Sequence, residues 1–285
     1  MIGLHLLTLI AVATVAVLAL PSNLTAVHQQ TCGTYLTSDA ITAAEAHFSA
    51  NKVSFKESKT GSTPVIPVYW HVIQSGNRQD QGKIPKSQIK DTIALLNKDY
   101  ARAGLTFKLA GYDRTINPFW FNTIVHGGPA EVAMKNKLRQ GDEKALNVYT
   151  VGKILNDQGK SGTVGYATFP SSYSRAPKDD GVVMLWNTAP GTQLGKALTH
   201  EAGHWAGLYH TFEGGCKSPG DHVDDTPPEA SPSYDCSKPR DTCSGGGVDP
   251  IHNIMDYGEG QCKTELTPGQ IRRIKDQLAT YRNIR

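Results

Sequence analysis

The sequence lacks an excess of charge of either sign. Its 285 residues carry 29 Lys and Arg against 26 Asp and Glu, a net charge of +3 at pH 7. The basic residues are scattered and form no stripe that could follow a phosphate backbone, so we expect no nucleic-acid partner. Internal repeats and low-complexity tracts are also missing, which excludes a repeat architecture. Hydrophobic residues make up 39% and charged residues 19%, the range of a folded globular protein.

An apolar run without charge stands at the N-terminus. It extends from Leu6 to Leu20, and it is shorter than the roughly 20 residues of a membrane span. We expect residues 1–19 to be a secretory signal peptide, with an uncleaved N-terminal anchor as the alternative. The mature protein is then secreted and extracellular, has no stable membrane association, and is expected to be a monomer.

The pattern of residues changes near position 60. Residues 20–60 are polar and are predicted to be a pro-segment and linker, with a short helix over 38–48. From there on, the periodicity predicts strands at 67–73, 105–112, 145–154, 162–169 and 181–186, and helices at 85–102, 129–139, 192–207 and 268–281. This order indicates an α+β domain over 61–285, with a mixed twisted sheet covered by helices.

Residues 208–285 are expected to form a loop-rich C-terminal subdomain that ends in the helix over 268–281. The stretch 211–265 is dense in Gly, Pro, Asp, Ser and Cys and shows no periodic element. Ordering each residue costs about 1–2 kcal/mol of backbone entropy, and few apolar side chains offset that cost here. We therefore expect disulfides or metal ions to hold this segment in shape.

The helix over 192–207 carries the motif HEAGHWAGLYH. His200 and His204 are four residues apart, so their imidazoles project from one helix face and can bind one ion. Gly207 allows a left-handed turn that ends the helix and brings His210 back to the same ion. Three histidines leave a coordination position open, which is typical of a catalytic zinc site.

Glu201 lies beside the two helical histidines and can reach a water on the metal. It would act as the general base while the water attacks a polarised carbonyl, and then return the proton to the leaving amine. The motif therefore predicts zinc-dependent hydrolysis of peptide bonds. The competing interpretation is a hydrogen-bonded histidine pair on an amphipathic helix, which the full spacing of the motif disfavours.

The motif resembles that of the metzincins, and the surrounding residues resemble the pappalysin family, especially its secreted fungal and microbial members. The stretch NIMDY is similar to the family's Met-turn, which implies that Met255 lies beneath the zinc site. The same resemblance implies that Tyr257 donates a hydrogen bond during the reaction. As the alternative, Met255 and Tyr257 would be ordinary core residues.

The resemblance continues through HTFEGGC and the acidic loop GDHVDDTPPEAS to the cysteines. Four cysteines allow three pairings, and the family implies Cys216 with Cys243 and Cys236 with Cys262. Relatives bind calcium in this region, where hard oxygen ligands come from Asp221, Asp224, Asp225 and Thr226. A solvated acidic loop without an ion is the alternative.

The fifth cysteine, Cys32, occurs in the context QTCGT, which resembles a short pro-segment motif of the family. A thiolate is a good zinc ligand, so Cys32 is a candidate cysteine switch that occupies the open position and keeps the enzyme latent. An unpaired thiol that is lost with the pro-segment is the alternative.

These features predict a secreted zinc endopeptidase that acts on proteins or peptides. The rivals are an exopeptidase or another metzincin branch, a secreted binding protein with a silent zinc site, and a structural zinc module. An intact Glu201 argues against the silent site, and the open coordination argues against the structural module. Relatives that prefer arginine carry an acidic residue where this chain has Gln261, so a preference for basic substrates is not implied.

Overall fold

The structure is a computed structural model, and it describes residues 31–56, 63–156, 158–190, 192 and 194–285. The predicted signal peptide and the predicted boundary at residue 60 lie outside the described residues. Within the described part of the chain, no helix combines the length and apolar content required to cross a membrane.

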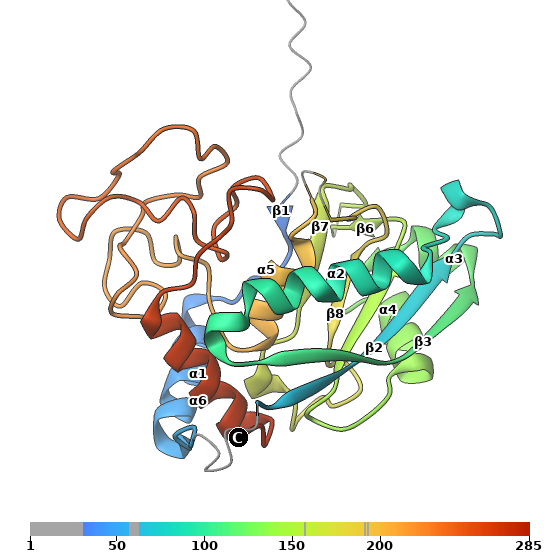
Figure 1. Ribbon diagram of the computed structural model, residues 1–285, viewed down its shortest axis with the longest axis horizontal. Coiled ribbons are helices and arrows are strands. Elements are labelled where there is room, and N and C mark those ends of the chain that lie inside the picture. Colours follow the sequence, from blue (N-terminus) through green and yellow to red (C-terminus); the bar gives the residue numbers. More distant parts are fainter. Residues whose placement is uncertain (1–30, 57–62, 157, 191, 193) are drawn as a thin grey trace, which may run out of the picture.

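A six-stranded mixed sheet forms the centre of the protein (Figure 1), in the order β1-β7-β8-β5-β2-β3. Its strands are Thr31–Cys32, Thr163–Ala167, Val182–Leu185, Leu146–Val151, Val65–Gln74 and Thr106–Ile116, in that order. Strand β7 runs antiparallel to β8, and the other pairs in the sheet are parallel. The expected α+β architecture with a mixed sheet is thus confirmed.

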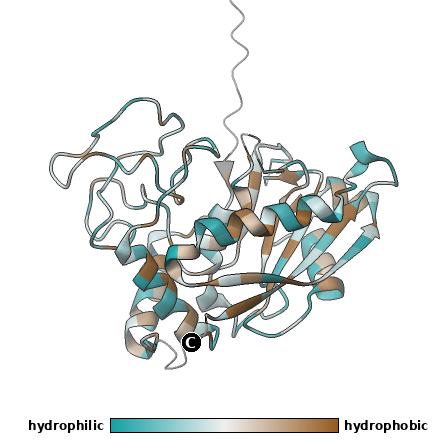
Figure 2. Ribbon diagram, in the orientation of Figure 1, coloured by the Kyte–Doolittle hydropathy of each residue, from teal (hydrophilic) through white to brown (hydrophobic). Residues whose placement is uncertain are grey.

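Helices cover both faces of this sheet. The six helices are α1 Ser38–Asn51, α2 Lys86–Asp99, α3 Pro118–Asn122, α4 Pro129–Leu138, α5 Ala197–Trp205 and α6 Pro268–Tyr281. Side chains of β2 alternate between the faces: Val68 and Trp70 join the core under α2 and α5, whereas Ile73 joins the core beneath α3 and α4. Figure 2 shows the hydrophobic residues concentrated along the central strands.

Strand β3 extends four residues beyond its predicted end, and β1, β4 and α3 were not predicted. Two predicted elements differ in other ways. The helix predicted over 192–207 begins only at Ala197, because Gly195 is a poor helix former and the chain before it makes turns. The strand predicted over 145–154 is split into β5 and β6 (Ile154–Leu155), and β6 pairs with β4 (Ile124–Val125) in a separate two-stranded sheet.

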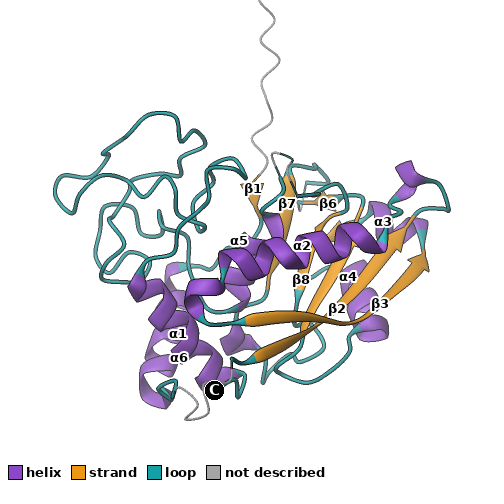
Figure 3. Ribbon diagram, viewed as in Figure 1, coloured by secondary structure: helices purple, strands orange, loops and turns teal. Residues whose placement is uncertain are grey.

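The segment between α5 and α6 is a large loop region (Figure 3), as its composition predicts. Two disulfides cross it, Cys216–Cys243 and Cys236–Cys262, which is the pairing implied by the family resemblance. Helix α6 follows the loops and packs against α1 (Figure 1), so the N-terminal and C-terminal parts of the described chain lie side by side.

Candidate metal centre

Helix α5 carries His200 and His204 into the interior, where both rings are buried. The Nδ1 atom of His200 lies 2.7 Å from the carbonyl oxygen of Ile254, and Nδ1 of His204 lies 2.8 Å from that of Leu208. Because a carbonyl only accepts, each Nδ1 must carry the proton and donate it. Each Nε2 atom then carries no proton, and its lone pair can bind a metal.

The third histidine reaches the same point because the helix ends abruptly. Gly207 has a φ of 98°, and the amide of Leu208 donates to the carbonyl of Gly203 at 2.9 Å. A side chain at position 207 would also meet Gln277, since a Cβ there would lie 2.6 Å from its Cγ. This turn places Nε2 of His210 3.2 Å from Nε2 of His204.

Four donor atoms converge at this position. One ligand atom each of Cys32, His200, His204 and His210 lies within 4.8 Å of the other three, and all four residues are buried. Nε2 of His200 is buried without a hydrogen-bond partner in the described part of the chain. Burial lowers the pKa of His210 to about 3, so its ring is neutral. Facing imidazole lone pairs repel unless a cation lies between them, and nitrogen and sulfur donors suit zinc.

Glu201 points from the same helix toward strand β7. Gly165 on β7 leaves room for this side chain, since a Cβ at Gly165 would lie 3.2 Å from Cγ of Glu201. Burial raises the pKa of the Glu201 carboxyl to about 7. A carboxylate with that pKa can take up and release a proton at neutral pH.

Tyr257 lies beside His200 and His210, and Met255 packs on helix α5 at Gly203. Met255 is fully buried, and a Cβ at Gly203 would come within 2.3 Å of its Sδ, so the thioether packs directly on α5. The Tyr257 ring centroid is 5.1 Å from that of His210, and its hydroxyl donates to the carbonyl of Cys32 at 3.2 Å.

The N-terminal segment crosses the site. Strand β1 pairs with β7, and the amide of Gly33 donates to the carbonyl of Gly165 at 2.8 Å. Sγ of Cys32 lies 3.5 Å from Nε2 of His204 and 3.4 Å from Oε2 of Glu201. The hydroxyl of Thr34 donates to the same Oε2 at 3.2 Å.

The role of Thr34 was not predicted from the sequence, because nothing local distinguishes it from other threonines. Its hydroxyl also accepts from the amide of Ala167 on β7 at 2.9 Å. The next residue, Tyr35, lies close to Tyr257, with 3.1 Å between the two hydroxyl oxygens. Residues 32–35 therefore contact both the Glu201 carboxyl and strand β7.

The four residues of the acidic loop have different surroundings. Oδ2 of Asp221 and Oγ1 of Thr226 are buried, and neither has a hydrogen-bond partner of good geometry among the described residues. Burial raises the pKa of the Asp221 carboxyl to about 7, although the nearby Thr226 hydroxyl lowers it in part. Asp225 instead accepts from the hydroxyl of Thr267 at 2.6 Å and from the amide of Gly269 at 2.8 Å, at the start of α6. Asp224 is exposed. The oxygens available to a cation are thus those of Asp221 and Thr226.

The chain is similar to known proteins. A family model described as "Pregnancy-associated plasma protein-A" matches residues 133–279. "Extracellular metalloprotease 1" of Coccidioides posadasii is 42% identical over 225 residues, which cover 76% of this chain and 78% of the relative. "Extracellular metalloprotease" of Verticillium alfalfae is 43% identical over 227 residues, 76% of each chain.

Two solved structures have a similar fold. A mutant of Tannerella forsythia promirolysin has a TM-score of 0.70 at 25% identity, covering 88% of this chain and 95% of its own. Mature mirolysin of the same organism, in complex with a cleaved peptide, has a TM-score of 0.58 at 25% identity. The match covers 78% of this chain and 97% of the mirolysin chain.

Proposed function

The chain belongs to the pappalysin family of metzincin metalloproteases, and on this basis we propose that it is a secreted zinc endopeptidase with Glu201 as its general base. The observation that carries the proposal is the convergence of three neutral imidazoles beside the buried carboxyl of Glu201, with backbone carbonyls holding the Nδ1 protons of His200 and His204. His200, His204 and His210 would hold the zinc.

Bound zinc would supply a Lewis acid that polarises the scissile carbonyl and lowers the pKa of a water molecule. The protein would supply the proton transfers. Glu201 takes a proton from the attacking water and delivers it to the leaving amine, and its pKa of about 7 suits both steps. Tyr257 donates a hydrogen bond to the carbonyl oxygen as negative charge develops there. Met255 holds the histidine-bearing helix in place by packing under it.

Substrates would bind along β7. This strand lies next to the outermost strand β1, and its other neighbour is β8. With β1 removed, the free edge of β7 can add an extended peptide through backbone hydrogen bonds. The mature mirolysin structure contains a cleaved peptide, which supports peptides and proteins as substrates of this chain. The curated relatives are named extracellular metalloproteases, which supports action outside the cell.

We propose that Cys32 keeps the precursor latent. Its thiol lies among the three histidines and contacts Glu201, so it occupies the space that water and substrate require. The neighbouring Thr34 covers the same carboxylate. The precursor form of mirolysin covers more of this chain than its mature form does, 88% against 78%, which supports assigning the N-terminal residues to a pro-segment.

Replacing Cys32 with Ser is therefore expected to give the intact precursor peptidase activity, because a hydroxyl is a much weaker zinc ligand than a thiolate. The measurement is cleavage of a quenched fluorescent peptide mixture by precursor that mass spectrometry shows to be uncut. The matched control is the double variant Cys32→Ser with Glu201→Gln, which should stay silent. A Cys32→Ser precursor as latent as the original would disprove the switch.

We also propose a calcium ion in the acidic loop, held by Asp221 and Thr226. Their buried unpartnered oxygens support this proposal, because a polar atom buried without a partner costs free energy that a cation would recover. A bound ion would stabilise a loop region that has little apolar core.

Calcium is expected to raise the free energy of unfolding by about 2.7 kcal/mol at a concentration 100 times its Kd. Asp221→Asn should remove most of this effect, whereas Asp224→Asn, an exposed change of the same charge on the same loop, should keep it. Thermal unfolding with and without calcium is the measurement. If calcium does not shift the unfolding of the unaltered protein, the loop has no such site.

A further inference from the structure

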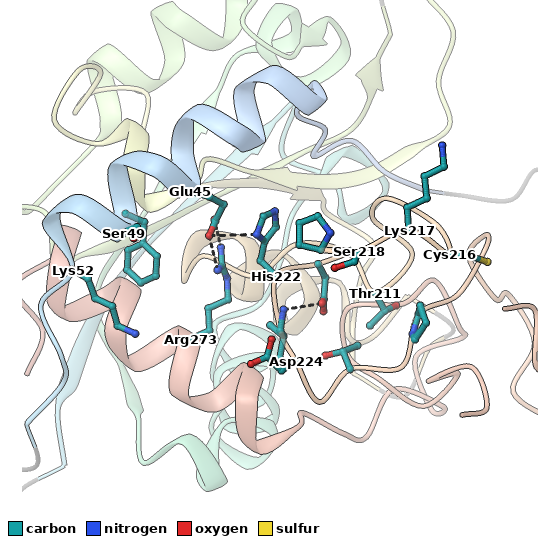
Figure 4. Close-up of a pocket in the computed structure, with 17 residues that line it drawn as sticks. Glu45, Ser49, Lys52, Thr211, Cys216, Lys217, Ser218, His222, Asp224 and Arg273 are labelled. Carbon is teal, nitrogen blue, oxygen red and sulfur yellow. Dashed lines mark hydrogen bonds and ion pairs between the residues drawn. The ribbon is translucent and has the colours of Figure 1, made fainter. Parts of the chain in front are cut away.

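Helix α1 follows Cys32 closely in the chain but docks at a different place, on α6 and the loop after α5. Figure 4 shows Glu45 of α1 directed toward Arg273 of α6 and His222 of the loop. Both terminal nitrogens of Arg273 donate to the Glu45 carboxylate, one of them at 3.0 Å. The hydroxyl of Tyr209 donates to the same carboxylate at 2.9 Å.

This ion pair is nearly free of solvent. The Arg273 side chain is 7% exposed and the Glu45 side chain 17%. Burial alone would raise the pKa of Glu45, but the hydrogen bonds and charge of Arg273 outweigh it, and the net pKa lies below the ordinary value. Glu45 is therefore ionised at neutral pH. A buried bidentate pair is costly to break, because the partner that remains keeps an uncompensated charge.

Apolar and backbone contacts surround the pair. Phe48 and Ile41 on α1 are buried, and Ile41 forms a small core with Phe169 and Tyr209. The Arg273 guanidinium lies 5.7 Å from the Phe48 ring centroid.

The chain after α1 continues along α6. The amide of Val53 donates to Thr280 Oγ1 at 2.9 Å, and the amide of Phe55 donates to Asp276 Oδ1 at 3.1 Å. Lys52 forms an ion pair with the same Asp276 at 2.8 Å. Residues 38–55 thus make a continuous interface.

None of these contacts uses the thiol of Cys32 or a metal-facing atom of the three histidines. The link to the metal centre is indirect: Nε of Arg273 donates to the carbonyl of Gly207 at 2.9 Å, in the turn that leads to His210. Arg273 therefore keeps its hydrogen bond to the Gly207 carbonyl when α1 departs.

We propose that this surface, formed by Arg273, Tyr209, His222, Phe169 and residues 276–281 of α6, is a helix-binding site that holds residues 38–55 independently of Cys32. Its chemistry selects an amphipathic helix with one carboxylate between two apolar turns, as in α1. Loss of the thiol from the metal centre would free residues 31–35 from the site but leave residues 38–55 attached, so departure of the whole N-terminal segment requires a second, separate release. The role of this surface in activation rests on the latency proposed above. The binding of residues 38–55 to the surface does not depend on that latency.

Hydrogen exchange of the full precursor, followed by mass spectrometry, tests this independence without measuring activity. In Cys32→Ser, the amides of α1 should exchange as slowly as in the unaltered chain. In Glu45→Gln, they should exchange at least about tenfold faster, because Arg273 loses its charged partner. Asp39→Asn, an exposed charge change on the same helix, is the matched control and should leave α1 protected.

Protection of α5 and the central strands should be unchanged in every variant, which separates local release of α1 from global unfolding. The proposal is overturned if Cys32→Ser alone exposes α1, or if Glu45→Gln leaves it protected. Should Glu45→Gln also lower the protection of α5, Lys52→Gln provides the second variant, expected to speed exchange at residues 52–55 only. Absence of activity in Cys32→Ser would count against the thiol switch and leave the α1 result intact.

Discussion

Replacing Glu201 with Gln is expected to lower kcat/KM for peptide cleavage by roughly 10²- to 10⁴-fold, the usual contribution of a general base. An amide has the shape of the carboxylate but accepts no proton at neutral pH. The buried position of Glu201 and its pKa of about 7 make it the group beside the histidines best suited to this transfer. Peptide cleavage by protein freed of its N-terminal segment is the measurement.

The zinc content of the Glu201→Gln variant is the control for this experiment. His200, His204 and His210 keep their ligand nitrogens, and His200 and His204 keep their hydrogen bonds to backbone carbonyls, so metal analysis should find as much zinc as in the unaltered protein. Retained activity with full zinc occupancy would refute the role of Glu201. Loss of both activity and zinc would show instead that the change disturbs the metal centre.

Removal of the metal is expected to abolish cleavage altogether, and zinc added in slight excess should restore it. Without a cation, the site has no Lewis acid to polarise the scissile carbonyl and to lower the pKa of the attacking water, and a hydrogen bond from Tyr257 does not replace that charge. The measurement is activity after treatment with a chelator and then after return of zinc, with metal content determined at each step.

A His210→Ala variant tests whether the third histidine belongs to this site. It should remain inactive at zinc concentrations that restore the unaltered protein, because two nitrogen ligands bind zinc more weakly than three. Calcium alone should not restore activity in either protein. Full recovery with calcium, or normal zinc binding by His210→Ala, would contradict the proposed ligand set.

Much of the site could be predicted from the sequence because its determinants are local. The spacing of His200 and His204 places them on one helix face, and Gly207 predicts the turn before His210. Helix α6 was predicted with its observed bounds, because its apolar residues Ile271, Ile274 and Leu278 recur on one face within a single stretch. The mixed sheet followed from the order of the predicted strands and helices.

The tertiary structure alone decided which distant groups surround these residues. Thr34 reaches Glu201 across 167 positions of sequence, and Glu45 meets Arg273 across 228. The composition of the acidic loop did not reveal that Asp225 bonds to the start of α6, leaving Asp221 and Thr226 with unpartnered oxygens. Such contacts depend on where packing brings separate elements together, and no periodicity within either element encodes the position of its partner. Local spacing therefore determined the chemistry, and long-range packing determined what covers it.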